Sequence, residues 1–243
     1  AYTMTEAVKD GITVNLVYDG RAAKVMLNQD KVRQIEEYYA QCELEGANEH
    51  QVEESQKAVA KMEVIIGDPD RLRAVAEDFI KHYETRVAEG ATVAGKAMFV
   101  CSNRNIAYDF YKIVKELRPE WTEKKICDDG VVLSEKDKKE LKPMEKIKLV
   151  MTRNKDDEKD LFDMLGTKED RKEFDRQFKN PKSNFKIAIV VDMWLTGFDV
   201  PELDTIYIDK PIQQHTLIQT ISRVNRVCEG KDKGLIVDYI GIK

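Results

Sequence analysis

One short segment near the carboxyl end of the sequence carries a glutamine and two arginines at helical spacing. Gln219, Arg223 and Arg226 are separated by four and three residues, and residues 214–226 have the pattern of an amphipathic helix. On such a helix the three side chains share one face. An arginine presents planar, paired donors that match phosphate oxygens, so this face could bind a nucleotide or could simply be solvated.

A second candidate segment follows a predicted buried strand at residues 187–191. It places Asp192 and Asp199 on either side of a glycine, Gly197, just beyond the end of that strand. Open α/β sheets bind ligands at the carboxyl ends of their strands, which favours a ligand site here. The alternative is structural: Asp192 would cap the next helix and Gly197 would form an ordinary turn.

Residues 90–96 match the first seven positions of the phosphate-binding Walker A pattern, but two observations argue against that role. The eighth position is Ala97, which has no hydroxyl to hold Mg²⁺. A phosphate-binding loop also leaves a strand and opens a helix, whereas these glycines follow a predicted helix and precede a predicted strand. The sequence has no GxGxxG motif either, so a dinucleotide-binding fold lacks its fingerprint.

The elements that must position these segments alternate between short apolar runs and amphipathic stretches. Asp68 is a suitable N-cap for a helix that is entered through Pro69 and ends near Gly90. This alternation predicts an α/β fold with a mainly parallel sheet flanked by helices. Strands are predicted at 97–101, 147–151, 186–191, 205–208 and 234–237, and further helices at 105–117, 168–179 and 214–226.

Composition narrows the class of protein. The 243 residues carry a formal net charge of -5, with 42% hydrophobic and 35% charged residues, which is typical of a globular protein of one or two domains. No apolar run approaches the ~20 residues of a membrane span, and the first residues lack signal-peptide features, so we expect a cytoplasmic protein without a membrane partner. Four dispersed cysteines argue against a disulfide framework or zinc site, and no metal ligand is assigned.

Charge is concentrated in two stretches of the chain. Residues 30–63 hold nine acidic and four basic residues, with apolar residues at helical spacing, and residues 134–182 carry about thirty charges of mixed sign. We interpret both stretches as solvated surface helices and loops. Alternatively, they could dock partner subunits of a larger complex, in which case the chain would be a non-enzymatic interaction module.

Together, these segments resemble the second RecA-like motor lobe of superfamily 2 helicases and translocases, and most closely the motor (R) subunit of type I restriction enzymes. Residues 191–199 (VDMWLTGFD) resemble motif V of that family, residues 219–226 (QTISRVNR) resemble motif VI, and residues 99–104 (FVCSNR) resemble motif IV. The resemblance covers residues 93–243 and implies a RecA-like three-layer fold. Residues 1–92 resemble the helical segment that links the two motor lobes of the same subunit.

The resemblance implies roles residue by residue. Arg226 is expected to contact the γ-phosphate of ATP as an arginine finger, with Arg223 as its companion. Gly197, Asp199 and Gln219 are expected to lie at the nucleotide. Four small polar residues at the ends of predicted strands are expected to contact the DNA backbone, although such residues also form turns. These four are Ser102, Asn103, Thr152 and Thr196.

The sequence departs from its relatives at two positions within these motifs. Ser222 stands where many relatives have glycine, which puts close helix packing near motif VI in doubt. Thr196 stands where many have arginine, which puts an arginine contact from motif V in doubt.

The motor machinery of the resembling subunit is also incomplete in this sequence, which contains no Walker A motif, no acidic Walker B box and no nuclease-type metal site. We therefore expect a fragment that alone neither hydrolyses ATP nor cuts DNA. In the full-length subunit, an ATP-dependent type I site-specific deoxyribonuclease, a first lobe would bind most of the ATP and Mg²⁺. The expected partners are double-stranded DNA, that first lobe and the nuclease domain, and the modification and specificity subunits.

Overall fold

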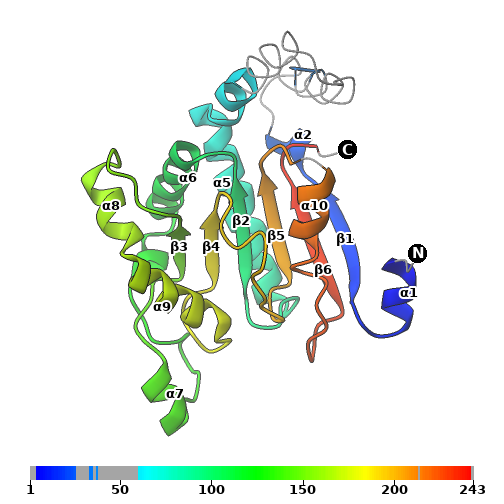
Figure 1. Ribbon diagram of the computed structural model, residues 1–243, viewed down its shortest axis with the longest axis vertical. Coiled ribbons are helices and arrows are strands. Elements are labelled where there is room, and N and C mark those ends of the chain that lie inside the picture. Colours follow the sequence, from blue (N-terminus) through cyan, green and yellow to red (C-terminus); the bar gives the residue numbers. More distant parts are fainter. Residues whose placement is uncertain (1–3, 26–32, 35–36, 38–59, 213, 242–243) are drawn as a thin grey trace.

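The computed structural model describes residues 4–25, 33–34, 37, 60–212 and 214–241, so the predicted acidic helices within residues 30–63 lie almost entirely outside the described residues. In the described ranges, parallel strands form one sheet in the order β1-β6-β5-β2-β4-β3, with helices on both faces (Figure 1). The α/β fold with a mainly parallel sheet is confirmed. The strands are β1 (Asn15–Gly20), β2 (Ala97–Cys101), β3 (Ile147–Val150), β4 (Ile187–Val190), β5 (Thr205–Asp209) and β6 (Lys233–Asp238).

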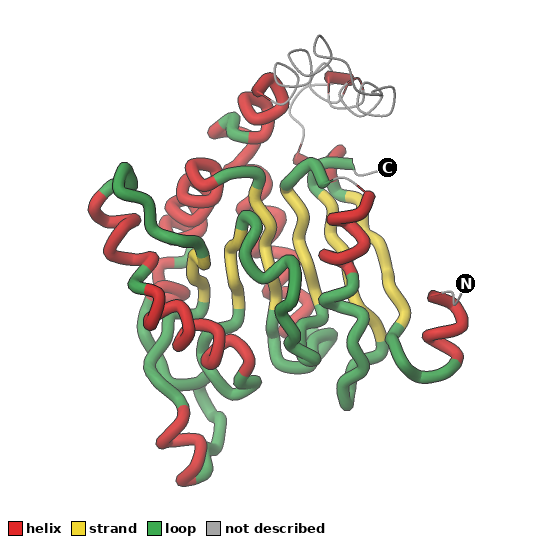
Figure 2. The backbone as a smooth tube through the Cα atoms, viewed as in Figure 1, coloured by secondary structure: helices red, strands yellow, loops and turns green. Residues whose placement is uncertain are grey.

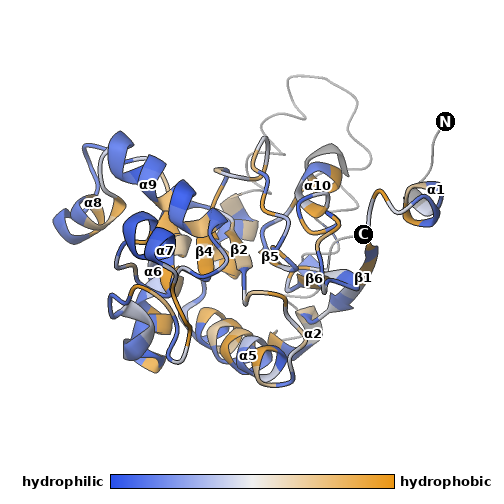
Figure 3. Cartoon of the chain, turned by 90° about the horizontal axis from the view of Figure 1, so that it is seen from below, coloured by the Kyte–Doolittle hydropathy of each residue, from blue (hydrophilic) through white to orange (hydrophobic). Residues whose placement is uncertain are grey.

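The helices are distributed over both faces of this sheet, which gives three layers. Helix α5 packs on one face, and α9 and α10 lie on the other (Figure 3). The helices are α1 (Met4–Lys9), α2 (Ala22–Val25), α5 (Pro69–Ala88), α6 (Arg104–Leu117), the 3₁₀ helix η1 (Pro119–Thr122), α7 (Glu135–Glu140), α8 (Lys159–Leu165), α9 (Lys168–Lys179) and α10 (Gln214–Ile221). Among the described residues, no helix is long and apolar enough to cross a membrane.

Two hydrophobic cores result from the alternation of side chains along the strands. Phe99 and Tyr207 point towards α5 and α6, whereas Val100 and Ile206 belong to the core beneath α9 and α10. All five residues of β2 are buried, as expected for a central strand of a sheet that is covered on both faces. The central strands are accordingly among the most hydrophobic parts of the chain (Figure 3).

Helix α5 begins and ends where the sequence predicts. The side chain of Asp68 accepts a hydrogen bond from the backbone N–H of Arg71, Pro69 occupies the first turn, and Gly90 follows the helix with φ +65°. Phe79, at the centre of its buried face, makes an edge-on contact with Tyr207 at 4.7 Å between ring centroids. The helix is therefore part of the core of the sheet.

Residues 90–96 take no part in a phosphate-binding loop, as the sequence indicates. They connect helix α5 to strand β2, which is the reverse of the strand-to-helix order that such a loop requires. Lys96, which would be the phosphate-binding lysine, is fully buried, and its Nζ donates a 2.5 Å hydrogen bond to the carbonyl oxygen of Phe185. Burial lowers the pKa of Lys96 well below its usual value.

Strand β1 is a feature that the sequence analysis missed, because residues 1–92 were expected to be helical. It pairs in parallel with β6, so that Asn15 lies opposite Lys233 and Gly20 opposite Asp238. The strand is an edge strand with mixed burial, and it therefore lacks the continuous apolar run that identifies the inner strands. The sheet thus includes residues on both sides of position 93, and the proposed division there stays a prediction.

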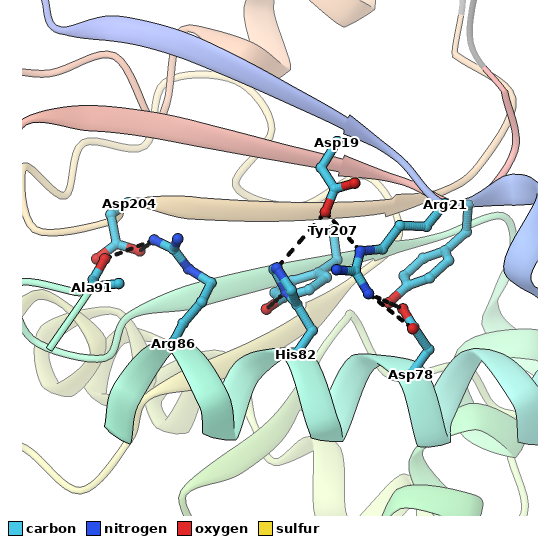
Figure 4. A network of polar contacts seen from close by, with 9 residues as sticks. Asp19, Arg21, Asp78, His82, Arg86, Ala91, Asp204 and Tyr207 are labelled. Atoms are coloured by element: carbon cyan, nitrogen blue, oxygen red, sulfur yellow. Dashed lines mark hydrogen bonds and ion pairs between the residues drawn. The ribbon is translucent and has the colours of Figure 1, made fainter. Parts of the chain in front are cut away.

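A polar network joins β1 to α5 (Figure 4). Both Asp78 oxygens accept hydrogen bonds from Nη1 of Arg21, at 2.8 and 2.9 Å, and Nε of Arg21 donates to Asp19 at 2.7 Å. One turn further along α5, Nδ1 of His82 lies 2.9 Å from the hydroxyl oxygen of Tyr207. These contacts tie the edge strand to the helix and to β5 through charged groups that are largely removed from water.

We predict that this network makes stability depend on pH through His82. Burial, followed by the positive charges of Arg21 and Arg86, lowers the pKa of His82 to about 4. The unfolded chain binds a proton near pH 6.5 and the folded chain does not, so stability is complete above pH 6.5 and falls as the pH drops towards 4. With solvent screening, the loss is about 1 kcal/mol between pH 6.5 and 5.

Urea unfolding of the chain at several pH values measures this effect, with His82→Gln as the comparison. Glutamine keeps a hydrogen-bonding group near Tyr207 and cannot titrate. The variant should therefore show a flatter free energy of unfolding between pH 6.5 and 5. Equal slopes in the two proteins would show that His82 does not cause the pH dependence.

Candidate functional site

The structure brings the two arginines of the expected motif VI together with the loop that carries motif V. Nε of Arg226 lies 3.3 Å from Oδ1 of Asp199, and Nη1 of Arg223 donates a 2.7 Å hydrogen bond to the carbonyl oxygen of Phe198. Two consecutive residues of the loop therefore hold the two arginines. This contact joins segments more than twenty residues apart and forms the candidate site.

The course of the chain after β4 explains this position. Strands β4 and β5 are parallel, so the connection must return from the carboxyl edge of the sheet to its amino edge. It does so as a loop without a helix, which runs across the face of the sheet (Figure 2). Leu195, Phe198 and Val200 are buried in the core beneath, whereas Gly197 and Asp199 are exposed.

The expectation that Gln219, Arg223 and Arg226 share one helical face is wrong, because α10 ends at Ile221. Residues 222–224 form a tight turn in which the N–H of Arg223 donates to the carbonyl of Thr220. The N–H of Val14 then donates to the carbonyl of Asn225 at 2.8 Å. Pairing with the segment before β1 thus overrides the helical pattern of residues 222–226.

A glycine makes this route possible. A Cβ atom on Gly234, in β6, would lie 2.3 Å from the carbonyl oxygen of Val224, a distance that real Cβ atoms do not reach. Only glycine lets the chain after α10 approach the sheet so closely. The turn that carries Arg223 is therefore fixed by backbone packing against β6.

The two arginines differ in how firmly they are held. Nε of Arg223 also donates to the carbonyl of Gln219 at 3.1 Å, so this side chain is anchored by two backbone oxygens. Burial and the neighbouring charge of Arg226 lower the pKa of Arg223 from its usual value. Arg226 is 51% exposed and Asp199 is 60% exposed, and an exposed ion pair of this kind contributes only about 0–1 kcal/mol. Arg226 can therefore exchange Asp199 for another anion at low cost.

Of the other residues expected at the nucleotide, Gly197 lies in this loop with φ +67°, a conformation that suits glycine. The side chain of Gln219 is exposed near the end of α10. Asp192, by contrast, caps no helix: its Oδ1 accepts a 2.5 Å hydrogen bond from Lys210, which also donates to the carbonyl of Val191. The alternative that Asp192 caps a helix is therefore wrong. Its side chain pairs with Lys210 at the start of the loop.

Three of the residues expected to contact DNA, Ser102, Asn103 and Thr152, lie just beyond strand ends at the carboxyl edge of the sheet, and Thr196 lies further along the loop after β4. Ser102 and Asn103 follow β2, and both make local contacts: Oγ of Ser102 donates to the carbonyl of Asp209 at 3.0 Å, and the side chain of Asn103 caps α6 by accepting from the N–H of Ile106. Thr152 follows β3 and Thr196 lies in the loop after β4, and both are exposed. Contacts of all four with DNA stay predictions.

Arg104 is a residue at this edge that the sequence analysis did not single out. Its Nη2 contacts both carboxylate oxygens of Asp157 at 2.5 and 2.7 Å, and its Nη1 donates to the carbonyl of Thr152 at 2.6 Å. Burial opposes ionisation of Asp157, but hydrogen bonds from the N–H of Asn154 and from Arg104 lower the pKa of this carboxyl. Arg104 thus links the loops after β2 and β3. Arg104 is the last residue of the segment that resembles motif IV, and this position could have identified it from the sequence.

The described part of the chain contains no cluster of side chains that could bind a metal ion. There, no group of three or more histidine, cysteine, aspartate or glutamate side chains is placed to hold a metal ion. The candidate site instead combines two guanidinium groups with one carboxylate and exposed backbone. The guanidinium groups suit phosphate oxygens, and the carboxylate of Asp199 is the present partner of Arg226.

A parallel sheet covered by helices on both faces is the architecture of a RecA-like α/β lobe. Similarity to a solved structure agrees: a fragment described as an HsdR subunit of a type I restriction enzyme from Vibrio vulnificus YJ016 has a TM-score of 0.53 at 12% identity, covering 97% of this chain and 34% of that one. At this identity the likeness shows the fold.

The sequence comparisons show the family. Residues 93–241 match the family described as type I restriction enzyme subunit R domain 3. The chain is 36% identical to the type I restriction enzyme HindI endonuclease subunit of Haemophilus influenzae over 99% of its length, and 36% identical to a protein named as the MjaIXP endonuclease subunit of Methanocaldococcus jannaschii over 100%. It therefore belongs to the family of type I restriction enzyme R subunits, and it spans about 20% of the length of these two relatives.

Proposed function

We propose that this chain is the second motor lobe of an ATP-dependent DNA translocase within a type I restriction enzyme R subunit. In this proposal Arg226 contacts the γ-phosphate of ATP as an arginine finger, Arg223 is its companion, and Gly197, Asp199 and Gln219 line the nucleotide. ATP and Mg²⁺ are held mainly by a first lobe across the cleft. The lobe works in the cytoplasm with the nuclease domain, the modification and specificity subunits, and double-stranded DNA.

The exposed ion pair between Arg226 and Asp199 is the observation that supports this proposal most directly. An arginine finger must be charged, solvent-facing and able to move to a phosphate group. Arg226 meets these conditions because its present partner holds it only weakly. ATP hydrolysis by the full-length subunit, compared with and without Arg226, tests the proposal.

A DNA contact at the carboxyl edge has its own support. Parallel strands place the ends of β2 and β3 on one edge, so Ser102 and Thr152 lie at the same edge of the sheet, and the loop that carries Thr196 starts from that edge at the end of β4. Hydroxyl groups and backbone N–H groups bind phosphates of the DNA backbone without reading its sequence. Closing and reopening the two lobes on ATP would then move these loops along the duplex.

We predict that the isolated 243-residue chain does not hydrolyse ATP or cut DNA. The proposal assigns phosphate binding, Mg²⁺ and the nuclease to other parts of the subunit, and an arginine finger alone cannot activate water. The measurement is phosphate release by the purified chain with and without duplex DNA. Turnover that is unchanged by Arg226→Ala would contradict the assignment of the active centre to an interface between two lobes.

The alternative function is an interaction module that docks partner subunits. It is favoured by α7, which extends away from the sheet, contains no buried residue and is rich in charge (Figure 1). The two functions are compatible in one chain. Full activity of the Arg226→Ala variant would leave the interaction module as the better explanation.

A further inference from the structure

The loop that carries Gly197 and Asp199 contains a strained residue, Trp194. Its φ of +69° is in the left-handed region, which is unfavourable for a residue with a Cβ atom and rare for bulky side chains. Such strain persists only where surrounding contacts impose it, and it concentrates at functional sites. The residue lies five positions before Asp199 in the candidate site.

The contacts of the Trp194 ring are aromatic. The ring of Trp194 stacks on that of Phe198 at 4.2 Å between centroids and 3° between planes, and Phe178 of α9 lies against both rings. Nζ of Lys179 is 4.9 Å from the centroid of Phe198. Phe178 and Phe198 are buried, so the stack is fixed to the core beneath α9.

The same residue, Phe198, connects the stack to both arginines. Its ring is held by Trp194, its carbonyl oxygen accepts the hydrogen bond from Arg223, and the next residue, Asp199, pairs with Arg226. If the Phe198 ring left the stack, the loop backbone would lose this anchor and could shift, and with it the carbonyl that accepts from Arg223. The indole ring therefore acts on the arginines through one intervening residue.

We propose that Trp194 is a positioning residue for the phosphate-contacting arginines: by stacking on Phe198, it holds the carbonyl that orients Arg223 and the loop position that presents Asp199 to Arg226. This inference rests on the proposed function, because it concerns the same site. Trp194 does not touch the nucleotide in this arrangement. Its effect is on the orientation of groups that do, so it should alter turnover more than ATP affinity.

The test is DNA-stimulated ATP hydrolysis by the full-length subunit in its complex, with three substitutions at this position. Trp194→Gly removes the ring and suits the left-handed backbone, so it separates the role of the ring from relief of strain. We expect kcat to fall about tenfold or more, with KM for ATP changed less than about threefold. Trp194→Phe keeps a stacking ring and should stay within about threefold of the wild type. Trp194→Leu, which keeps apolar bulk without a stacking face, should show the same split as the glycine variant.

A double-mutant cycle that combines Trp194→Gly with Arg223→Ala tests whether Trp194 acts through Arg223. The part of the Trp194 effect that passes through Arg223 is lost once Arg223 is absent, so the glycine substitution should cost less in the Arg223→Ala background than in the wild type. Fully additive losses would overturn the inference, as would full turnover by both the glycine and leucine variants while the arginine variants are impaired. If Arg223→Ala and Arg226→Ala are both fully active, the proposed function itself fails, and the inference fails with it.

Discussion

Replacing Arg226 by alanine in the full-length subunit is expected to lower DNA-stimulated ATP hydrolysis at least about a hundredfold. Arginine fingers contribute about 10³–10⁵ in rate, or roughly 4–7 kcal/mol of barrier, because they neutralise charge on the transferring phosphoryl group. The fold should tolerate the change, since Arg226 is half exposed and its ion pair with Asp199 contributes little to stability. Loss of activity can then be assigned to chemistry.

The experiment compares steady-state ATP hydrolysis by the assembled complex with saturating duplex DNA. Arg226→Lys keeps the charge but not the planar fork, and should recover little of the activity. Arg176→Ala on α9 is the matched control, because this exposed arginine forms a similar surface pair with Glu173 and lies outside the candidate site. DNA binding should be the same for all variants. Unchanged hydrolysis by Arg226→Ala would show that the chain resembles motor lobes in fold only.

Removing the charge of Asp209 is expected to destabilise the fold by about 3–5 kcal/mol, because it leaves a buried cation without its partner. Arg71 is 1% exposed and Asp209 is fully buried, with nitrogen–oxygen distances of 2.5 and 3.1 Å between their paired groups. Arg71 also donates to the carbonyls of Ile66 and Tyr239, both at 3.1 Å. This pair joins the first turn of α5 to the end of β5.

Urea unfolding of wild type and Asp209→Asn measures the loss. Arg73→Ala is the control on the same helix: Arg73 is exposed and pairs with Glu116, so its removal should cost less than about 0.5 kcal/mol. The double variant Arg71→Met with Asp209→Leu should regain much of the loss, since no buried charge remains. A cost below about 1 kcal/mol for Asp209→Asn would show that Arg71 finds another partner or water.

The position of this pair links stability to the candidate site. The carbonyl of Asp209 accepts the hydrogen bond from Ser102, so the buried pair lies directly at the edge where DNA contacts are proposed. A weakened pair should therefore loosen the carboxyl edge of β5 and β2 before the rest of the sheet. Helix α5, although it precedes position 93, thus supports the edge that the proposed function uses.

Local patterns in the sequence determined the inner part of the fold. The apolar run of β2, the N-cap Asp68 and the order of strands and helices each depend on residues close together in the chain, so they predicted a parallel α/β sheet correctly. The reversed order of helix and strand around residues 90–96 excluded a phosphate-binding loop for the same reason. The motif V and VI segments were also visible as local strings of residue types.

Only the tertiary structure decided which distant segments meet. Strand β1 pairs with β6 more than 200 residues away, and its mixed pattern carries no local signal of that pairing. The helix expected to reach Arg226 ends at Ile221, because the carbonyl of Asn225 accepts a hydrogen bond from Val14. Gly234, which has no Cβ atom, lets the chain at Val224 lie close against the sheet. Helical periodicity is a property of neighbouring residues, whereas the end of this helix and the meeting of Arg226 with Asp199 depend on packing between remote segments.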